Sequence, residues 1–359
     1  MSEQRSTGEQ LAQILAQQAA RRGVNWAIGA IGGLPLLLIV LFVIFMAALG
    51  VFLGGGMSGT TGVHTPPIGT AEARPTLWLG YPAVAQSGLP NVLVVSVMAH
   101  ESSGRVLAQT FNCLGGTASA QPCEQSGGVT TSEDAGLMQI NSGGWPVPEK
   151  ATKWQSLGMA DDPCDPSLNI PAGVDQLQAE ARQYRYAEYA LEAYNSGSGG
   201  PNSFDTAYPT AVKSYITAYE AGPTISAWST ADYSHGQWQA QRHQQYWLVV
   251  AAAGPYGAKF SVPWKPLPPK CTTITNQTTG QKTTTCVKQD AMLTGRALEI
   301  PTSATVNGQP MALDPKDAPL WPGEEAYALQ VTGPGTYDVT ATWPGGHRAV
   351  TLIPIAKEE

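Results

Sequence analysis

The apolar run Leu34–Leu53 constrains this chain more than any other feature. It is 20 residues long, and no charged residue occurs from Gly23 through Ala71. At about 1.5 Å per residue, a helix of this length crosses the hydrocarbon core of a bilayer. A cleaved secretion signal usually has a shorter apolar core, of about 7–15 residues. We therefore expect a transmembrane helix within residues 24–53 and not a signal peptide.

The basic residues beside this run predict its orientation. Arg21 and Arg22 precede it, and the next Lys or Arg is Arg74. The positive-inside rule places residues 1–23 in the cytoplasm and the rest of the chain outside, so the protein is expected to be a single-pass protein of the cytoplasmic membrane. Residues 54–75 form a Gly/Ser/Thr/Pro-rich linker. The net charge of −7 offers no basic surface for direct binding of nucleic acid.

Glu101 continues the apolar face of a predicted helix. Pro90 suits the first turn of this helix, and Ser102-Ser103-Gly104 ends it. The face is formed by Leu93, Val94, Val97 and Met98. Apolar surroundings and the negative end of the helix both disfavour a charged carboxyl. A glutamic acid that keeps its proton can act as the general acid of glycosidic cleavage. The alternative is a glutamate that caps the helix or bends into solvent.

Two later motifs add to this interpretation. Gly136-Leu137-Met138-Gln139-Ile140-Asn141 follows Asp134, and Ala193-Tyr194-Asn195-Ser196-Gly197 comes further on. With Glu101-Ser102, and in this order, they resemble the goose-type lysozymes and lytic transglycosylases, over roughly residues 85–222. The stretch from Asp134 to Asn141 is most similar to the lytic transglycosylases of conjugation and type IV secretion systems. The resemblance implies a mainly α, lysozyme-like catalytic domain.

The resemblance also implies roles for individual residues. Glu101 matches the catalytic acid, and Ser102 matches the serine that follows it. Met138, Gln139 and Asn195 match residues of the glycan groove, and Tyr194 matches a tyrosine whose hydroxyl points at the acid. From the residues alone, Met138 and Tyr194 are equally compatible with core packing, and Asn195 with a helix cap.

The expected reaction is cleavage of the β-1,4 bond between N-acetylmuramic acid and N-acetylglucosamine in peptidoglycan, without a cofactor. In lytic transglycosylases the substrate's N-acetyl group assists and its C6 hydroxyl attacks, so the resemblance implies that no second carboxylate is needed. Glu133 and Asp134 are candidates for a base that would activate water, as in a true muramidase. A third alternative is a non-catalytic scaffold that binds glycan. The expected partners are glycan strands, the membrane and channel proteins of a conjugation or secretion system.

The five cysteines all follow the predicted membrane helix, where disulfides persist. Cys271 and Cys286 bracket a threonine-rich hairpin, so we expect them to be bonded. Cys113–Cys123 is the simplest pair in the catalytic domain, although Cys164 could pair with either. These two cysteines lie in a Gly/Ser/Thr/Gln-rich segment, residues 108–131, that we expect to be an inserted surface loop. No Cys-x-x-Cys occurs and the five histidines are scattered, so no metal site is expected.

The predicted order of domains follows from these features. It runs as a cytoplasmic tail (1–23), a transmembrane helix (24–53), a linker (54–75), a catalytic domain (76–222), a helix and Pro-rich joint (223–270), a disulfide hairpin (271–287) and a small β-rich domain (288–359). In the β-rich domain, Thr336–Trp343 alternates with the period of a strand, and Arg348–Leu352 is predicted to be the strand that returns beside it.

Overall fold

The computed structural model describes residues 73–114, 117–147, 149–196, 206–229, 245–275, 277, 280–318 and 320–355. The predicted tail (1–23), transmembrane helix (24–53) and all but the end of the linker (54–75) lie outside these residues. Within the described ranges, no helix is both long enough and apolar enough to cross a membrane. These ranges all belong to one compact unit, residues 58–359.

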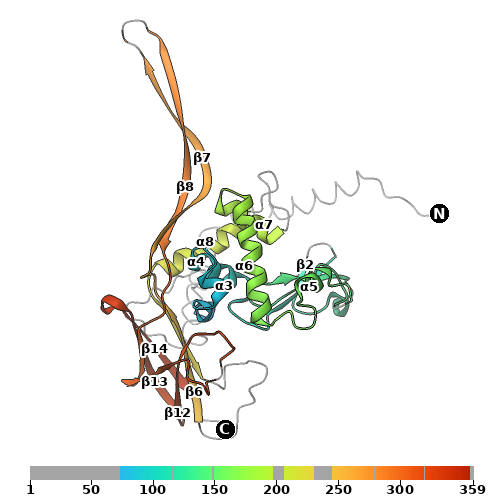
Figure 1. The fold of residues 1–359 in the computed structure, drawn as a ribbon, viewed down its shortest axis with the longest axis vertical. Helices are drawn as coiled ribbons and strands as arrows, with labels where there is room; N and C mark the ends of the chain where they lie inside the picture. Colours follow the sequence, from blue (N-terminus) through green and yellow to red (C-terminus); the bar gives the residue numbers. More distant parts are fainter. Residues whose placement is uncertain are drawn as a thin grey trace, which may run out of the picture. The chain divides into compact units, whose positions relative to one another are not determined.

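Six α-helices and a short 3-10 helix form the first half of the described chain (Figure 1). They are η1 (Arg74–Trp78), α3 (Pro82–Ala85), α4 (Asn91–Ser102), α5 (Thr152–Leu157), α6 (Pro166–Gln183), α7 (Ala187–Ser196) and α8 (Ala207–Glu220).

Helix α4 is the centre of the helical half. Every residue from Val92 to Ala99 is buried, so the helix is covered on all sides and not only along the predicted face. It packs against α8 and η1. As predicted, it ends just after Glu101, where Ser103 adopts a left-handed conformation. A central helix that ends there holds the Glu101 carboxyl inside the protein.

A small antiparallel sheet of strand order β2-β1-β3-β4 follows α4. Its strands are β1 (Gln109–Cys113), β2 (Thr117–Ser119), β3 (Thr130–Ala135) and β4 (Ile140–Asn141). The predicted disulfide Cys113–Cys123 is present and joins β1 to the 3-10 helix η2 (Cys123–Ser126). The interpretation of residues 108–131 as a plain surface loop is therefore wrong. Its threonine-rich segments are β-compatible and pair through their backbones.

The last part of the chain forms two four-stranded sheets, β10-β9-β13-β14 and β11-β12-β6-β5. Their strands are β5 (Thr224–Ser229), β6 (Gln245–Ala253), β9 (Ser303–Val306), β10 (Gln309–Pro310), β11 (Ala312–Leu313), β12 (Tyr327–Thr332), β13 (Gly335–Thr342) and β14 (Arg348–Ile355). β13 and β14 confirm the predicted strand pair, and the short 3-10 turn η3 (Pro344–Gly346) connects them.

The helix predicted near residues 224–253 is wrong, because this segment contributes β5 and β6. Trp238 lies outside the described residues, but Leu248 to Ala253 are all buried in β6. A short apolar run of this kind is equally compatible with a buried helix and a buried strand. Here β6 lies between β12 and β5, so pairing on both sides decides the outcome. The β-rich region thus begins at Thr224 and not near 288.

The predicted Pro-rich joint is part of a long hairpin, formed by β7 (Lys259–Thr275) and β8 (Lys282–Arg296). The prolines at 263, 266, 268 and 269 lie in β7, whose register with β8 shifts between Pro263 and Lys265 and between Leu267 and Lys270. A two-stranded ribbon with bulges tolerates proline because its outer edge needs no N–H donor. Cys271 lies opposite Cys286, and the predicted disulfide between them is present.

Hydrogen bonds from side chains and from the backbone attach the β-rich region to the helices. The Asn91 side chain donates to the Leu298 carbonyl and accepts from the Leu298 N–H, both at 2.9 Å. The Glu220 carboxylate at the end of α8 accepts from the Arg296 N–H at 2.8 Å. The Glu325 N–H donates to the Leu77 carbonyl of η1 at 2.7 Å. The two parts therefore share several contacts of fixed geometry.

Candidate active site

Glu101 lies in the last turn of α4, and its carboxyl group is enclosed by protein. The Tyr208 hydroxyl, near the start of α8, donates a hydrogen bond to its Oε1. The pKa of Glu101 is raised from 4.5 to about 7. Burial is the main cause, the Tyr208 bond opposes the rise, and the charge of Asp134 adds to it. A carboxyl with this pKa is half protonated near neutral pH and can give up a proton.

Two hollows meet at Glu101, which lines both of them. The first has a volume of about 420 Å³ and is lined mainly by polar side chains. They include Asn112, Ser132, Asp134, Gln139, Asn141, Lys153, Gln176 and Asn195. Amide, hydroxyl and carboxyl groups can bond the hydroxyl and acetamido groups of a sugar. Glu101 is therefore the residue that the linings of the two hollows share.

Asp134 is the second carboxyl group of the first hollow. Asn112 Nδ2 donates to its Oδ2 at 2.7 Å, and Asn141 Nδ2 donates to its Oδ1 at 2.8 Å. Burial raises the pKa of Asp134, while these two bonds and the nearby charge of Lys153 oppose the rise. Glu133, next to it on β3, is buried, because alternate residues of a strand point to opposite faces. Of the two predicted candidates for a base, only Asp134 lines this hollow.

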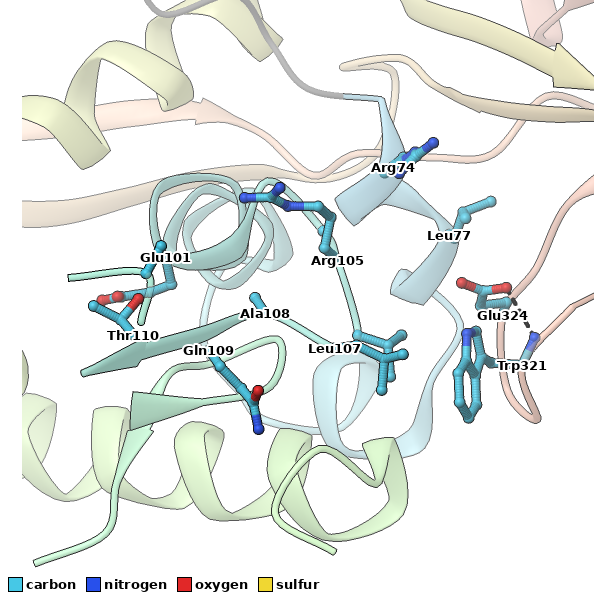
Figure 2. A pocket seen from close by; sticks show the side chains of 13 residues that line it. Arg74, Leu77, Glu101, Arg105, Leu107, Ala108, Gln109, Thr110, Trp321 and Glu324 are labelled. Atoms are coloured by element: carbon cyan, nitrogen blue, oxygen red, sulfur yellow. Dashed lines mark hydrogen bonds between the residues drawn. The ribbon is translucent and has the colours of Figure 1, made fainter. Parts of the chain in front are cut away.

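The second hollow, of about 480 Å³, is shown in Figure 2. Its walls come from η1, from the loop and strand that follow Glu101, and from a loop of the β-rich region. Arg74, Arg105, Leu107, Trp321 and Glu324 are among the residues that line it. It therefore combines cationic and apolar side chains, unlike the first hollow.

Comparison with known protein families identifies the catalytic segment. Residues 82–208 match the family model of the transglycosylase SLT domain. These residues form an SLT domain. The family comprises lytic transglycosylases that act on peptidoglycan, so the domain is an enzyme of that type. No curated protein and no solved structure matches the chain. The matched segment contains both Glu101 and Tyr208, and the β-rich region lies beyond it.

Three of the residues predicted to bind substrate, Gln139, Tyr194 and Asn195, line the first hollow of the SLT domain. Gln139 has a left-handed backbone (φ 46°), and its Nε2 donates to the carbonyls of Ala108 and Gly136 at 3.0 and 2.9 Å. These bonds hold the Gln139 side chain at the hollow, with its amide oxygen left for a ligand. Asn195, at the end of α7, is exposed and lines the same hollow.

Ser102 and Met138 were predicted to bind substrate, and the structure contradicts both predictions. The Ser102 hydroxyl is buried, donates to the Leu137 carbonyl at 2.9 Å and so ties α4 to the Gly136–Asn141 loop. The Met138 side chain is fully buried against Gly173 of α6. Both residues support the groove from beneath, because the loop turns its apolar side chains toward the core and its backbone toward the hollow.

Tyr194 lines the first hollow, but its hydroxyl, predicted to point at the acid, bonds a backbone carbonyl instead. Its hydroxyl donates to the Met138 carbonyl at 2.8 Å, and its ring stacks on Tyr208 with centroids 6.5 Å apart. Tyr208 makes the bond to Glu101. Sequence reasoning missed Tyr208 because it lies in no motif. The only signal is its buried helical spacing with Val212, Ile216 and Tyr219, which indicates a core face and no chemistry.

Asn169 fixes the loop that carries Gln139. Its buried side chain accepts from the Met138 N–H at 2.8 Å and donates to the carbonyls of Ala135 and Pro163 at 2.7 and 3.0 Å. Gly136 has φ of 77°, and a Cβ there would collide with this carboxamide. The glycine of the motif is therefore required by both its backbone angle and the close approach of Asn169.

The remaining titratable groups give no sign of a metal centre. The part of the chain that the structure describes contains no cluster of three His, Cys, Asp or Glu side chains able to hold a metal ion. Cys164 is a buried thiol outside the two disulfides, and burial raises its pKa to about 11. It is therefore an uncharged core residue.

Proposed function

We propose that Glu101 is the general acid of the SLT domain and that the bond it cleaves is the β-1,4 link from N-acetylmuramic acid to N-acetylglucosamine. The observation that carries this proposal is the position of the Glu101 carboxyl, with a pKa of about 7, at the meeting point of two hollows. An enzyme that cuts within a strand needs binding surface on both sides of the scissile bond, and this arrangement supplies it.

The proposed step transfers the Glu101 proton to the glycosidic oxygen as the bond from that oxygen to C1 of the muramic acid breaks. The N-acetyl group of the same sugar assists. Its C6 hydroxyl then bonds to C1, and the hydroxyl proton returns to the Glu101 carboxylate, which leaves a 1,6-anhydro sugar. The Tyr208 hydrogen bond favours the carboxylate, so it stabilises Glu101 in the interval between the two proton transfers.

True muramidase hydrolysis is the second candidate, and the position of Asp134 supports it. A base that activates water must lie in the groove with the acid, and Asp134 lines the same hollow as Glu101. Its two amide donors favour the charged form that a base requires. The products distinguish the reactions, since transglycosylation leaves anhydro ends and hydrolysis leaves reducing ends.

We further propose that the enzyme is anchored in the cytoplasmic membrane, with the SLT domain outside. The apolar run Leu34–Leu53 and the preceding Arg21 and Arg22 support an anchor of this orientation. The two disulfides support an oxidising, extracytoplasmic compartment. On this proposal, cleavage next to the membrane opens the wall locally for a conjugation or secretion channel. The similarity of Asp134–Asn141 to enzymes of such systems supports that role.

The test is digestion of purified sacculi by the full chain in detergent, with mass spectrometry of the released fragments. We expect anhydro-muropeptides from the native protein and a loss of about 10²–10⁴-fold in Glu101→Gln. Glu149→Gln, which changes an exposed glutamate, is the matched control and should keep full activity. Fragments released equally well by Glu101→Gln would refute the role of Glu101. Binding of glycan without release by the native protein would favour a non-catalytic scaffold.

A further inference from the structure

The second hollow lies partly outside the SLT domain. The family match covers residues 82–208, whereas Arg74, Leu77, Trp321 and Glu324 come from before and after it. Glu101 lines the hollow at one end, and Figure 2 shows Trp321 and Glu324 at the other. A ligand that extends from the acid in this direction therefore reaches the β-rich region.

The loop that carries Trp321 is held in place by short-range hydrogen bonds. At its base, Asp314 and Ala326 are paired, since the Asp314 N–H donates to the Ala326 carbonyl at 2.9 Å and the Ala326 N–H donates to Asp314 Oδ1 at 2.7 Å. At its tip, the Trp321 N–H donates to Glu324 Oε2 at 2.9 Å, and the Glu324 N–H donates to the Trp321 carbonyl at 3.0 Å. The wall is thus already formed before a ligand arrives.

The same loop is fastened to the helical half. The Glu325 N–H donates to the Leu77 carbonyl, and Gly323 packs against the Tyr81 ring. Gly80 leaves room for the Glu325 carboxylate, because a Cβ at that position would overlap it. The distance from Trp321 to the SLT domain is therefore set by packing, and preorganisation of this kind favours binding.

The side chains of the hollow match two features of a muramyl residue. Leu107 has 50% of its surface exposed, and with the half-buried Trp321 ring it offers an apolar surface, as the non-polar face of a sugar requires. The guanidinium group of Arg105 suits carboxylates, which the peptide arm of muramic acid carries. The guanidinium group of Arg74 lies over the Trp228 ring, 5.2 Å from its centroid. Arg105 is exposed, and its Nε donates to the Ser102 carbonyl at 3.2 Å, so its terminal NH₂ groups are positioned at the hollow.

We propose that the second hollow binds a muramyl-peptide unit of the glycan strand, with Trp321 and Leu107 against the sugar and Arg105 on a peptide carboxylate. This inference rests on the proposed function, because the unit must be part of the strand that Glu101 cleaves. The loop 314–325 is thus a specificity element that the β-rich region adds to the SLT domain. Glycan strands that keep their peptides bind better than strands from which the peptides have been removed.

The test measures binding of soluble glycan strands to the full chain in a Glu101→Gln background, which prevents cleavage. Two ligands are compared, strands with their stem peptides and strands stripped by an amidase. We expect Trp321→Ala to weaken binding of both ligands by about threefold to tenfold. We expect Arg105→Gln to weaken only the peptide-bearing strands, by about tenfold. Leu352→Ala and Arg348→Gln, at exposed positions of β14, are the matched controls and should bind both ligands like the parent.

Unchanged binding in both Trp321→Ala and Arg105→Gln, in variants whose melting temperatures equal the parent's, would overturn the proposal. An equal loss on both ligands in Arg105→Gln would overturn the assignment of the peptide carboxylate. Digestion of sacculi by the native chain is run in parallel. It distinguishes refutation of the second hollow's role from refutation of the proposed function. A native chain that releases no fragments refutes the function, whereas an active chain with unchanged variant binding refutes only the role of the second hollow.

Discussion

The two hollows at Glu101 are built in different ways. The first is lined mainly by polar residues of the SLT domain, and among them the Asn141 amide donates hydrogen bonds to Ser132 and Asp134. The second is half apolar and needs a loop of the β-rich region to close it. The SLT match thus covers the whole lining of the first hollow, whereas the second hollow also uses residues outside that match. The following predictions test this division.

The largest effect on stability is expected from Asn169, whose side chain holds the loop that carries Gln139. Asn169→Ala removes three hydrogen bonds from buried backbone groups and should lower the free energy of unfolding by about 3–5 kcal/mol. Denaturant unfolding measures the change. The exposed Asn195→Ala is the control and should change stability by less than about 0.5 kcal/mol. A stable Asn169→Ala protein with an intact first hollow would show that this network is dispensable.

The acid shared by both hollows should reduce stability at neutral pH. The pKa of Glu101 is about 7 in the folded protein and 4.5 when unfolded, so the folded state binds the proton more tightly. Stability therefore falls as pH rises from about 4.5 to 7 and then levels off. A pKa difference corresponds to about 1.4 kcal/mol per pH unit. The native protein should therefore lose on the order of 3 kcal/mol of unfolding free energy between pH 4.5 and pH 8, and Glu101→Gln should not show this loss. Equal pH dependence in unfolding titrations of both proteins would contradict this.

The pH dependence of the rate should show that Tyr208 and Asp134 shift the pKa of Glu101 in opposite directions. Activity requires the protonated acid, so it is full below about pH 6 and falls as pH rises through about 7. Tyr208→Phe removes a bond that favours the charge and should move this fall to higher pH. Asp134→Asn removes a repelling charge and should move it to lower pH. Shifts in the same direction would contradict the assigned causes.

Asp134→Asn also decides between the two reactions. A transglycosylase should keep most of its rate at pH 5, whereas a muramidase that uses Asp134 as its base should lose about 10²-fold or more. The rate of fragment release from sacculi and the ratio of anhydro to reducing ends measure this. Asn112→Ala, which removes one donor to Asp134 but keeps its carboxylate, is the control for damage to the hollow.

The smallest effect on cleavage is expected from a change in the β7–β8 hairpin. Replacing Cys271 and Cys286 by serine opens a 15-residue loop in an exposed part of the β7–β8 hairpin. The change should lower the stability of that hairpin by up to about 3 kcal/mol without altering the rate of sacculus cleavage. Hydrogen exchange of the hairpin amides checks the loss of stability, and the rate assay checks the cleavage. Loss of cleavage would mean that the hairpin contributes to substrate binding.

The chemistry could be predicted from the sequence, whereas much of its geometry could not. Glu101 stood out because a carboxyl on an apolar helix face is costly, and the motifs after it indicated the enzyme class. Ser102 and Met138 share those motifs but are buried in the core, whereas Tyr194 lines the first hollow while its hydroxyl bonds the Met138 carbonyl. A motif shows which residues occur together in the sequence, but it does not show which of their side chains face the hollow. The direction of a side chain depends on backbone angles such as the left-handed φ of Gln139.

Residue type and local spacing were enough to predict the SLT domain, the Cys271–Cys286 bond and the β13–β14 pair, because each has few alternatives. The pairing of Cys113 with Cys123 was only one of three possibilities until the fold brought the two together. The tertiary structure alone decided that Tyr208 bonds Glu101 across 107 positions of sequence, that Leu248–Ala253 is a central strand, and that Trp321 reaches the SLT domain. These outcomes depend on pairing and packing between distant segments. Local patterns do not encode such contacts, since the same apolar run or lone aromatic residue fits several neighbours equally well.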